Sequence, residues 1–238
     1  MQLFVTCLVD SFYPQTGQAV VSILRRLGLS VEFQCDQTCC AQPLFNAGMH
    51  RDARPIAEHT LRIFEAASGD LVIPSGSCAH MLKHGYPELF ADDPLWLPRA
   101  RALADRVFEF TEYLVDRLGV SDLGARWDGV LAYHPSCHTL RAMDIDRQPR
   151  LLLANVAGAQ IVDLPEAEDC CGFGGIFSIE HPELSAELLK RKVANLEASG
   201  SPTLVAAESG CLMHVAGGLH RQKKAQRIVH IAEVLDHR

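Results

Sequence analysis

Residues 169–175 of this chain read DCCGFGG, and a related stretch, TCCAQP, occupies residues 38–43. Neighbouring Cα atoms lie about 3.8 Å apart across a trans peptide, whereas an ordinary disulfide needs about 4.4–6.8 Å. Two adjacent cysteines therefore make a poor disulfide with each other. Their thiolates are better suited to binding one multinuclear centre or two neighbouring metals. The glycines that follow the second pair would let the backbone turn tightly and approach such a centre closely.

The cysteine pairs belong to an internal repeat that covers most of the chain. In the first copy one cysteine precedes the pair by 32 positions and another follows it by 38, and in the second copy these spacings are 33 and 40. The contexts also agree, since SGSCAHM (75–81) matches ESGCLMH (208–214). Repeats at a fixed offset indicate repeated structural units. Eight of the nine cysteines thus form two sets, namely Cys7, Cys39, Cys40 and Cys78, and Cys137, Cys170, Cys171 and Cys211.

The segments between the cysteines alternate between strand and helix patterns. Runs rich in β-branched and aromatic residues predict strands at 3–9, 30–33, 70–74, 129–134, 160–164 and 203–208. Amphipathic runs predict helices at 14–28, 54–68, 103–118 and 182–199. This alternation is typical of α/β proteins with mainly parallel sheets. Each patterned cysteine then lies at or just beyond the carboxyl end of a strand, at the sheet edge where such proteins bind ligands.

The repeat and the alternation together predict the domain organisation. We expect an α/β protein with two tandem, pseudo-symmetric lobes, each holding a cysteine cluster. The first cysteine-rich repeat is predicted to span residues 1–90 and the second residues 127–238, with a connecting helical segment over 91–126.

The composition bounds the class of protein. Hydrophobic residues make up 48% of the chain, and the formal net charge of −7 comes from acidic and basic residues that are mixed along it. No basic stripe indicates nucleic-acid binding, no apolar run has membrane-spanning length, and the N-terminal sequence lacks signal-peptide features. We therefore expect a cytoplasmic protein without a transmembrane segment. In a reducing cytoplasm, nine cysteines favour metal binding or redox chemistry over stable disulfides.

Seven stretches resemble a known family: LFVTCLVDSFYP, QTCCAQPLFNAG, IPSGSCAHM, YHPSCHTLR, EDCCGFGGIFSIEHPELS, SGCLMH and HIAEVL. They resemble the cysteine-rich CCG domain, which occurs twice in one of the subunits of heterodisulfide reductase. Over its whole length the chain resembles the lactate utilization protein A family. The resemblance implies an electron-transfer subunit of an oxidoreductase complex that converts L-lactate to pyruvate. It implies one or two iron–sulfur clusters of the 4Fe-4S type, and as partners a ferredoxin-type iron–sulfur subunit and a third small subunit.

The resemblance also implies which residues hold the clusters. The family's ligands fall on the two sets Cys7, Cys39, Cys40 and Cys78, and Cys137, Cys170, Cys171 and Cys211. The chain departs from the complete motif, which ends in C-x-x-C, because Ser75 and Glu208 stand at the first of those two positions. Ala41 stands where the second copy has Gly172, and a positive φ there would strain alanine. Cys35, just before the first pair, is a candidate fifth ligand.

The residues alone leave two alternatives open. The adjacent cysteines could cycle through a strained vicinal disulfide, as in a heterodisulfide reductase-like thiol–disulfide redox protein. Alternatively, zinc held by four thiolates could brace a structural scaffold subunit. His80, His138 and His214 lie near site cysteines and are expected to neighbour the ligands, while His134 is interpreted as part of a strand end. No catalytic residue is assigned, because no flavin, nicotinamide or Ser-His-Asp pattern is visible.

Overall fold

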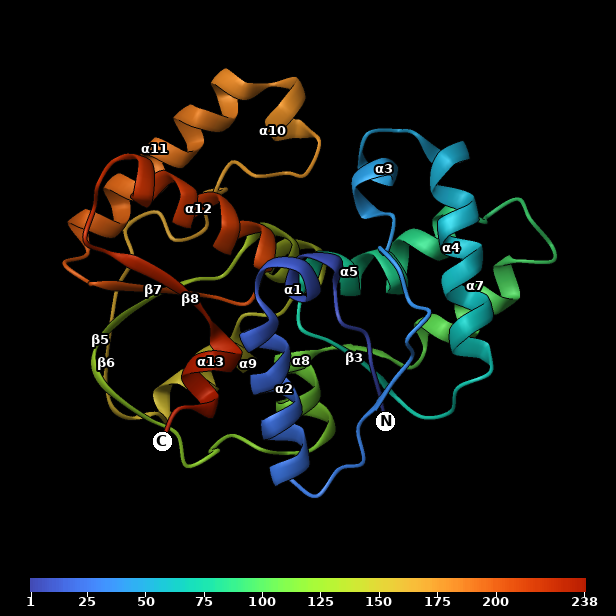
Figure 1. Cartoon of the computed structure of the whole chain (residues 1–238), viewed down its shortest axis with the longest axis horizontal. Coiled ribbons are helices and arrows are strands. Elements are labelled where there is room, and N and C mark those ends of the chain that lie inside the picture. The colour runs from blue at the N-terminus through green and yellow to red at the C-terminus, as the bar shows by residue number, and fades with distance from the viewer.

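The computed structural model describes all 238 residues and contains two four-stranded sheets, one in each half of the chain (Figure 1). The strand orders are β2-β1-β3-β4 and β6-β5-β7-β8, so both sheets have the same topology. Every neighbouring pair of strands is parallel. The predicted α/β class with two tandem, pseudo-symmetric lobes is therefore confirmed.

The two sheets use short strands. Those of the first sheet are β1 (Gln2–Leu3), β2 (Glu32–Phe33), β3 (Leu71–Ile73) and β4 (Val107–Glu109). Those of the second sheet are β5 (Arg126–His134), β6 (Ala157–Val162), β7 (Thr203–Ala206) and β8 (Arg227–His230).

The helices connect and cover these strands. In the first half they are α1 (Cys7–Phe12), α2 (Pro14–Arg26), α3 (Gln42–Asn46), α4 (His50–Glu65), α5 (Gly76–His80), α6 (Tyr86–Leu89), α7 (Leu97–Ala104) and α8 (Phe110–Glu112). In the second half they are α9 (Arg147–Ala154), α10 (Phe177–Glu180), α11 (Pro182–Ala198), α12 (Ser209–Arg221) and α13 (Ile231–Asp236). Three π-helical turns add to them, η1 (Met81–Gly85), η2 (Tyr113–Arg117) and η3 (His138–Ala142).

The strand order gives each sheet a topological switch point. In the first sheet the chain runs from β1 outward to β2 and then returns to place β3 on the other side of β1. The second sheet repeats this path with β5, β6 and β7. Open α/β sheets bind ligands at such a switch point, outside the carboxyl ends of the strands. The same edge carries the cysteine segments in both lobes.

Two sequence-based predictions of secondary structure were wrong. The strand predicted at 3–9 stops at Leu3, and α1 begins at Cys7 because the Thr6 side chain accepts a hydrogen bond from the Val9 amide. The helix predicted at 103–118 is interrupted by β4, whose first and last residues, Val107 and Glu109, are buried. Backbone pairing with β3 outweighs helix periodicity there. The boundaries at residues 90 and 127 stay a prediction, and β4 completes the first sheet from within the segment between them.

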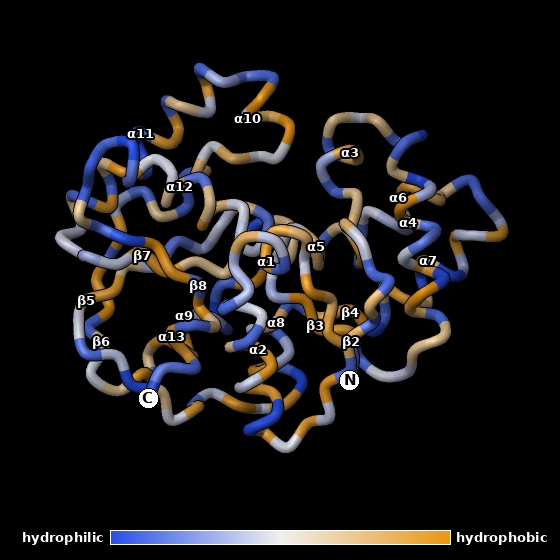
Figure 2. Tube along the Cα trace, in the orientation of Figure 1, coloured by the Kyte–Doolittle hydropathy of each residue, from blue (hydrophilic) through white to orange (hydrophobic).

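The lobes share a hydrophobic core. The largest buried cluster has 22 residues and includes Val72 of the first sheet and Val205 of the second. Helix α2 lies beside α13 near the C-terminus (Figure 1), where Arg26 forms an ion pair with Asp236 at 2.6 Å. Figure 2 shows hydrophobic residues along β3, β4 and β5. This common core holds the two cysteine-bearing sheet edges in a defined relative position.

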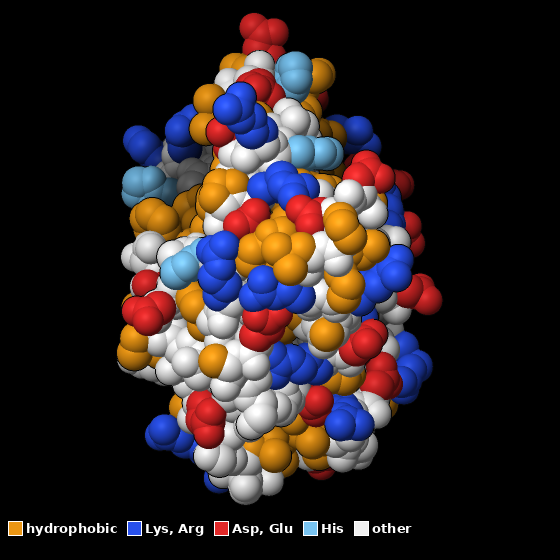
Figure 3. All heavy atoms as spheres, turned by 90° about the vertical axis from the view of Figure 1, so that its right-hand side faces the viewer, with side chains coloured by type: hydrophobic (Ala, Val, Ile, Leu, Met, Phe, Trp, Pro, Cys, Tyr) orange, Lys and Arg blue, Asp and Glu red, His pale blue; other side chains and the backbone are white.

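The surface mixes charges of both signs. Figure 3 shows Lys and Arg side chains interspersed with Asp and Glu on the face of the first lobe that carries α4 and α7. On these helices the guanidinium groups of Arg62 and Arg99 stack over the ring of Trp96. No helix of the chain is both long and apolar enough to span a bilayer.

Candidate metal centre between the two lobes

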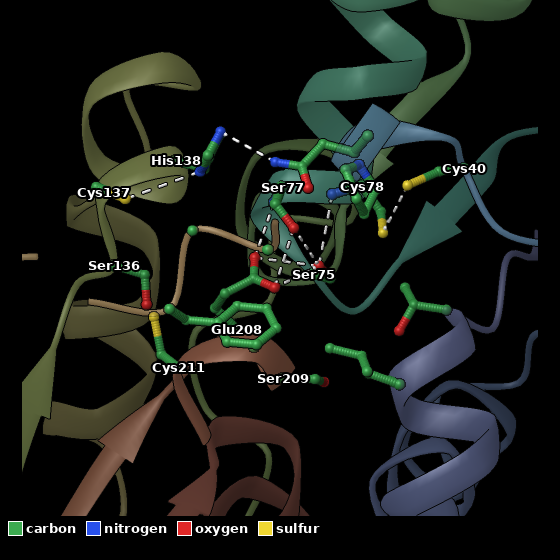
Figure 4. Close-up of a pocket in the computed structure, with 18 of the residues that line it drawn as sticks. Cys40, Ser75, Ser77, Cys78, Ser136, Cys137, His138, Glu208, Ser209 and Cys211 are labelled. Carbon is green, nitrogen blue, oxygen red and sulfur yellow. Dashed lines mark hydrogen bonds between the residues drawn. The ribbon is translucent and has the colours of Figure 1, made fainter. Parts of the chain in front are cut away.

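All eight cysteines of the two repeated sets line one cavity of about 140 Å³. We call Cys7, Cys39, Cys40 and Cys78 the first cradle, and Cys137, Cys170, Cys171 and Cys211 the second cradle. Figure 4 shows Cys40 and Cys78 on one side of this cavity and Cys137 and Cys211 on the other. Cys35 is exposed and does not line the cavity. The fold therefore gathers residues that lie as much as 204 positions apart in the chain.

Equivalent elements present the cysteines in the two lobes. In the first cradle Cys7 begins α1 just after β1, and Cys78 lies in the first turn of α5 after β3. In the second cradle Cys137 precedes η3 after β5, and Cys211 lies in the first turn of α12 after β7. The adjacent pairs occupy the loops after β2 and β6. Helix N-termini stabilise negative charge, which favours thiolates at these positions.

The sulfur atoms form close but unbonded pairs. The Cys40 and Cys78 Sγ atoms lie 3.1 Å apart, and those of Cys171 and Cys211 lie 3.0 Å apart. All nine cysteines are free thiols. Thiolates that share a tetrahedral metal at about 2.3 Å lie about 3.8 Å apart. The two thiols of each of these pairs are thus close enough to bind a common metal after a small adjustment.

Each cradle holds a thiol that ionises easily. A hydrogen bond from the Cys40 thiol lowers the pKa of Cys39 to about 3. A hydrogen bond from the Cys137 thiol lowers the pKa of Cys170 to about 2, and the Gly172 amide donates to its Sγ at 3.3 Å. The thiolate is the form that binds metals. Each cradle therefore offers at least one thiolate to a soft metal at neutral pH.

The residue after each pair adopts a left-handed backbone conformation. φ is +68° at Ala41 and +94° at Gly172. A Cβ atom on Gly172 would lie 2.5 Å from the Ser185 carbonyl oxygen of α11. The positive φ considered from the sequence is thus present in both copies, and the first lobe accommodates alanine with it.

The two departures from the C-x-x-C motif contact each other across the lobes. The buried Glu208 carboxylate accepts hydrogen bonds from Ser75 Oγ at 2.9 Å and from the Ser77 amide at 2.8 Å. Ser77 Oγ donates to it at 3.0 Å (Figure 4). Burial raises the pKa of Glu208. At the positions where the complete motif has cysteines, this chain therefore has Ser75 and Glu208, which join the two lobes by hydrogen bonds. We call Ser75, Ser77 and Glu208 the polar clasp.

We expect Glu208→Ala to lower the free energy of unfolding by about 1–3 kcal/mol, because Ser75 and Ser77 lose their buried acceptor. Urea denaturation followed by circular dichroism measures this change. The matched control is Glu187→Ala, which removes an exposed carboxylate on α11. Equal stability of the two variants would show that the clasp does not hold the lobes together.

The three histidines expected to neighbour the ligands differ in what they contact. His138 lines the cavity, and its Nδ1 lies 3.8 Å from Cys137 Sγ. The ring of His80 lies 5.7 Å from that of His138 and is tilted to it, and His214 Nε2 lies 3.3 Å from Ser185 Oγ. The sequence interpretation missed His134, whose ligand atom lies within 4.8 Å of the Cys171 and Cys211 sulfurs. The repeat offset could have revealed it, because it aligns His134 with Phe4.

The fold and the site define a protein with two tandem cysteine-rich domains that meet at one thiol-lined cavity. The cysteine-rich domain family named CCG matches residues 1–83 and 131–216. Lactate utilization protein A of Exiguobacterium sp. (strain ATCC BAA-1283 / AT1b) is 45% identical over 235 residues, which cover 98% of this chain and 96% of that protein. Lactate utilization protein A of Geobacillus sp. (strain WCH70) is 44% identical over 238 residues, which cover 100% and 99%. The chain belongs to the lactate utilization protein A family.

Proposed function

We propose that this protein acts in lactate utilization as an iron–sulfur electron-transfer subunit of a complex that oxidises L-lactate to pyruvate. The observation that carries this proposal is the convergence of eight cysteines on one cavity between two lobes. The names of its relatives support the role in lactate utilization. The protein is then one subunit of an oxidoreductase and does not complete the reaction alone.

The donor set of the cradles fits an iron–sulfur cluster. Four thiols per cradle match the ligand count of such clusters. An iron–sulfur cluster supplies a one-electron carrier whose potential depends on its ligands, on hydrogen bonds to sulfur and on burial. The chain contributes the Gly172 amide, which donates to Cys170 Sγ, and buries Cys40, Cys78, Cys171 and Cys211. Zinc also accepts four thiolates, so metal analysis must separate the two.

An electron-transfer subunit needs one protein that delivers electrons to it and another that accepts them. We propose a ferredoxin-type iron–sulfur subunit and a third small subunit, and we place the assembly in the cytoplasm. The cavity borders a groove between α3 and α10 that is lined by Pro43, Ala47, Ile176 and Phe177. Ile179 of α10 also exposes a large hydrophobic side chain, as do Phe12 of α1 and Leu184 of α11. Contacts with partner subunits would cover such side chains.

Anaerobic purification followed by metal and sulfide analysis tests the proposed function. We expect brown protein with iron and acid-labile sulfide, because the thiols can hold clusters that air would destroy. Colourless protein with stoichiometric zinc would replace the proposal by the scaffold role. Colourless, metal-free protein that resists cluster reconstitution and loses thiols on oxidation would replace it by thiol–disulfide chemistry.

A further inference from the structure

A buried imidazole faces the second cradle and takes no part in the proposed cluster ligand set. His134 ends β5 and is 0% exposed. Its ligand nitrogen and the sulfurs of Cys171 and Cys211 all lie within 4.8 Å of one another. A tetrahedral metal holds imidazole nitrogen and thiolate sulfur about 3.6 Å apart. An adjustment of about 1 Å would therefore place all three atoms on one ion.

The hydrogen bonding of His134 determines which nitrogen is free. Nδ1 lies 3.1 Å from the Ala167 carbonyl oxygen. A carbonyl oxygen only accepts hydrogen bonds, so Nδ1 carries the proton in this contact. In the neutral ring Nε2 then carries a bare lone pair, and it is buried without a hydrogen-bond partner. Histidines that ligate metals commonly donate their other ring N–H to a carbonyl in this way.

A buried lysine, Lys192, donates a hydrogen bond to the same carbonyl oxygen, that of Ala167. Lys192 Nζ donates to the Ala167 carbonyl oxygen at 3.1 Å and to that of Glu166 at 3.0 Å. Lys192 is fully buried and forms no ion pair with a carboxylate. Its positive charge therefore lies beside the second cradle and offsets the negative charge of thiolates there. Lys192 and His134 together fix the loop that bears Ala167.

The first lobe lacks both groups at the equivalent positions. Leu3 pairs with Val72 in the first sheet as Tyr133 pairs with Val205 in the second. Phe4 is therefore the residue of the first lobe that is equivalent to His134. The buried positions of α4 recur in α11 at an offset of 132, so Thr60 is the residue of the first lobe that is equivalent to Lys192. The first lobe thus has a phenyl ring in the buried cluster that holds Cys40 and Cys78, where the second lobe has an imidazole beside Cys171 and Cys211.

We propose that His134 Nε2 is a metal ligand in the second lobe, together with the sulfurs of Cys171 and Cys211, and that the first lobe has no such nitrogen ligand. Binding a divalent ion releases any proton that the two sulfurs still carry, whereas the bare Nε2 releases none. The proposal rests on the proposed function where the ion is the iron of a cluster.

Nitrogen hyperfine coupling tests this assignment directly. The full-length protein is prepared anaerobically with ¹⁵N-labelled histidine and measured by pulsed electron paramagnetic resonance. We expect a histidine nitrogen coupling that disappears in His134→Phe and persists in His138→Gln and His214→Gln. Phenylalanine is the residue of the first lobe at this position, and His134→Asn serves as a second variant if the ring change prevents folding. Absence of coupling, or its persistence in both His134 variants, overturns the assignment.

A cobalt experiment separates this assignment from the proposed function. Metal-free, reduced protein is titrated with Co²⁺ and examined by X-ray absorption for imidazole scattering. If no iron cluster assembles but cobalt shows an imidazole ligand that is lost in His134→Phe, the metal site stands and the electron-transfer role falls. If clusters assemble without any histidine coupling, the electron-transfer role stands and the His134 ligand falls. If neither probe shows histidine, the assignment is wrong whatever the metal.

Discussion

Cys171→Ser is expected to remove the metal centre of the second lobe while leaving that of the first intact. The Cys171 thiol is buried, and its Sγ lies 3.0 Å from that of Cys211 at the base of the second cradle. A serine hydroxyl is a hard, weakly acidic ligand and replaces thiolate poorly on iron or zinc. Serine is close to cysteine in size, so the fold should persist. Iron and sulfide per chain, together with the paramagnetic resonance spectrum of the anaerobic protein, measure the loss.

The repeat provides matched controls for this variant. Cys40→Ser alters the equivalent position of the first cradle and should remove the complementary centre. Cys35→Ser alters an exposed thiol outside the cavity and should leave the metal content unchanged. The iron contents of the two cradle variants should add up to that of the unaltered protein. Full iron content and an unchanged spectrum in Cys171→Ser would remove this residue from the ligand set.

Gly172→Ala is expected to destabilise the protein by about 3 kcal/mol or more, or to prevent folding of the second lobe. The residue has a φ of +94°, which strains any residue with a Cβ atom. That atom would also lie 2.5 Å from the Ser185 carbonyl oxygen, a backbone atom of α11 that cannot rotate away. Ser185 Oγ donates to the Gly172 carbonyl at 2.8 Å, which ties the two segments together. Urea denaturation gives the change in unfolding free energy.

Ala41→Gly is the reciprocal control in the first lobe. Ala41 already adopts a φ of +68°, so glycine relieves backbone strain there. Glycine also raises the conformational entropy of the unfolded chain, which opposes this gain in stability. We expect these effects to offset each other to within about 1 kcal/mol. If Gly172→Ala were tolerated as well as Ala41→Gly, close packing against α11 would not explain the glycine.

Several features of the fold could be predicted because they depend on local patterns. The strands at 30–33 and 70–74 and the helices at 14–28 and 182–199 correspond to β2, β3, α2 and α11. Both fourth strands, β4 and β8, were missed: the residues of β4 lie within a run that has helical periodicity, and no strand was predicted over residues 227–230. The interpretation of His134 as a strand end was correct for its place in β5 but overlooked its side chain.

The amino-acid sequence by itself determined the repeat, the two sets of four cysteines and their placement after strands, since spacing and periodicity are local properties of the chain. Only the tertiary structure decided that both sets line one cavity, and that Ser75 meets Glu208 over a separation of 133 positions. Only the tertiary structure, again, brought the imidazole of His134 close to two sulfurs. The physical reason is that the shared core between the lobes, and the hydrogen bonds it orients, join residues whose proximity no local pattern records.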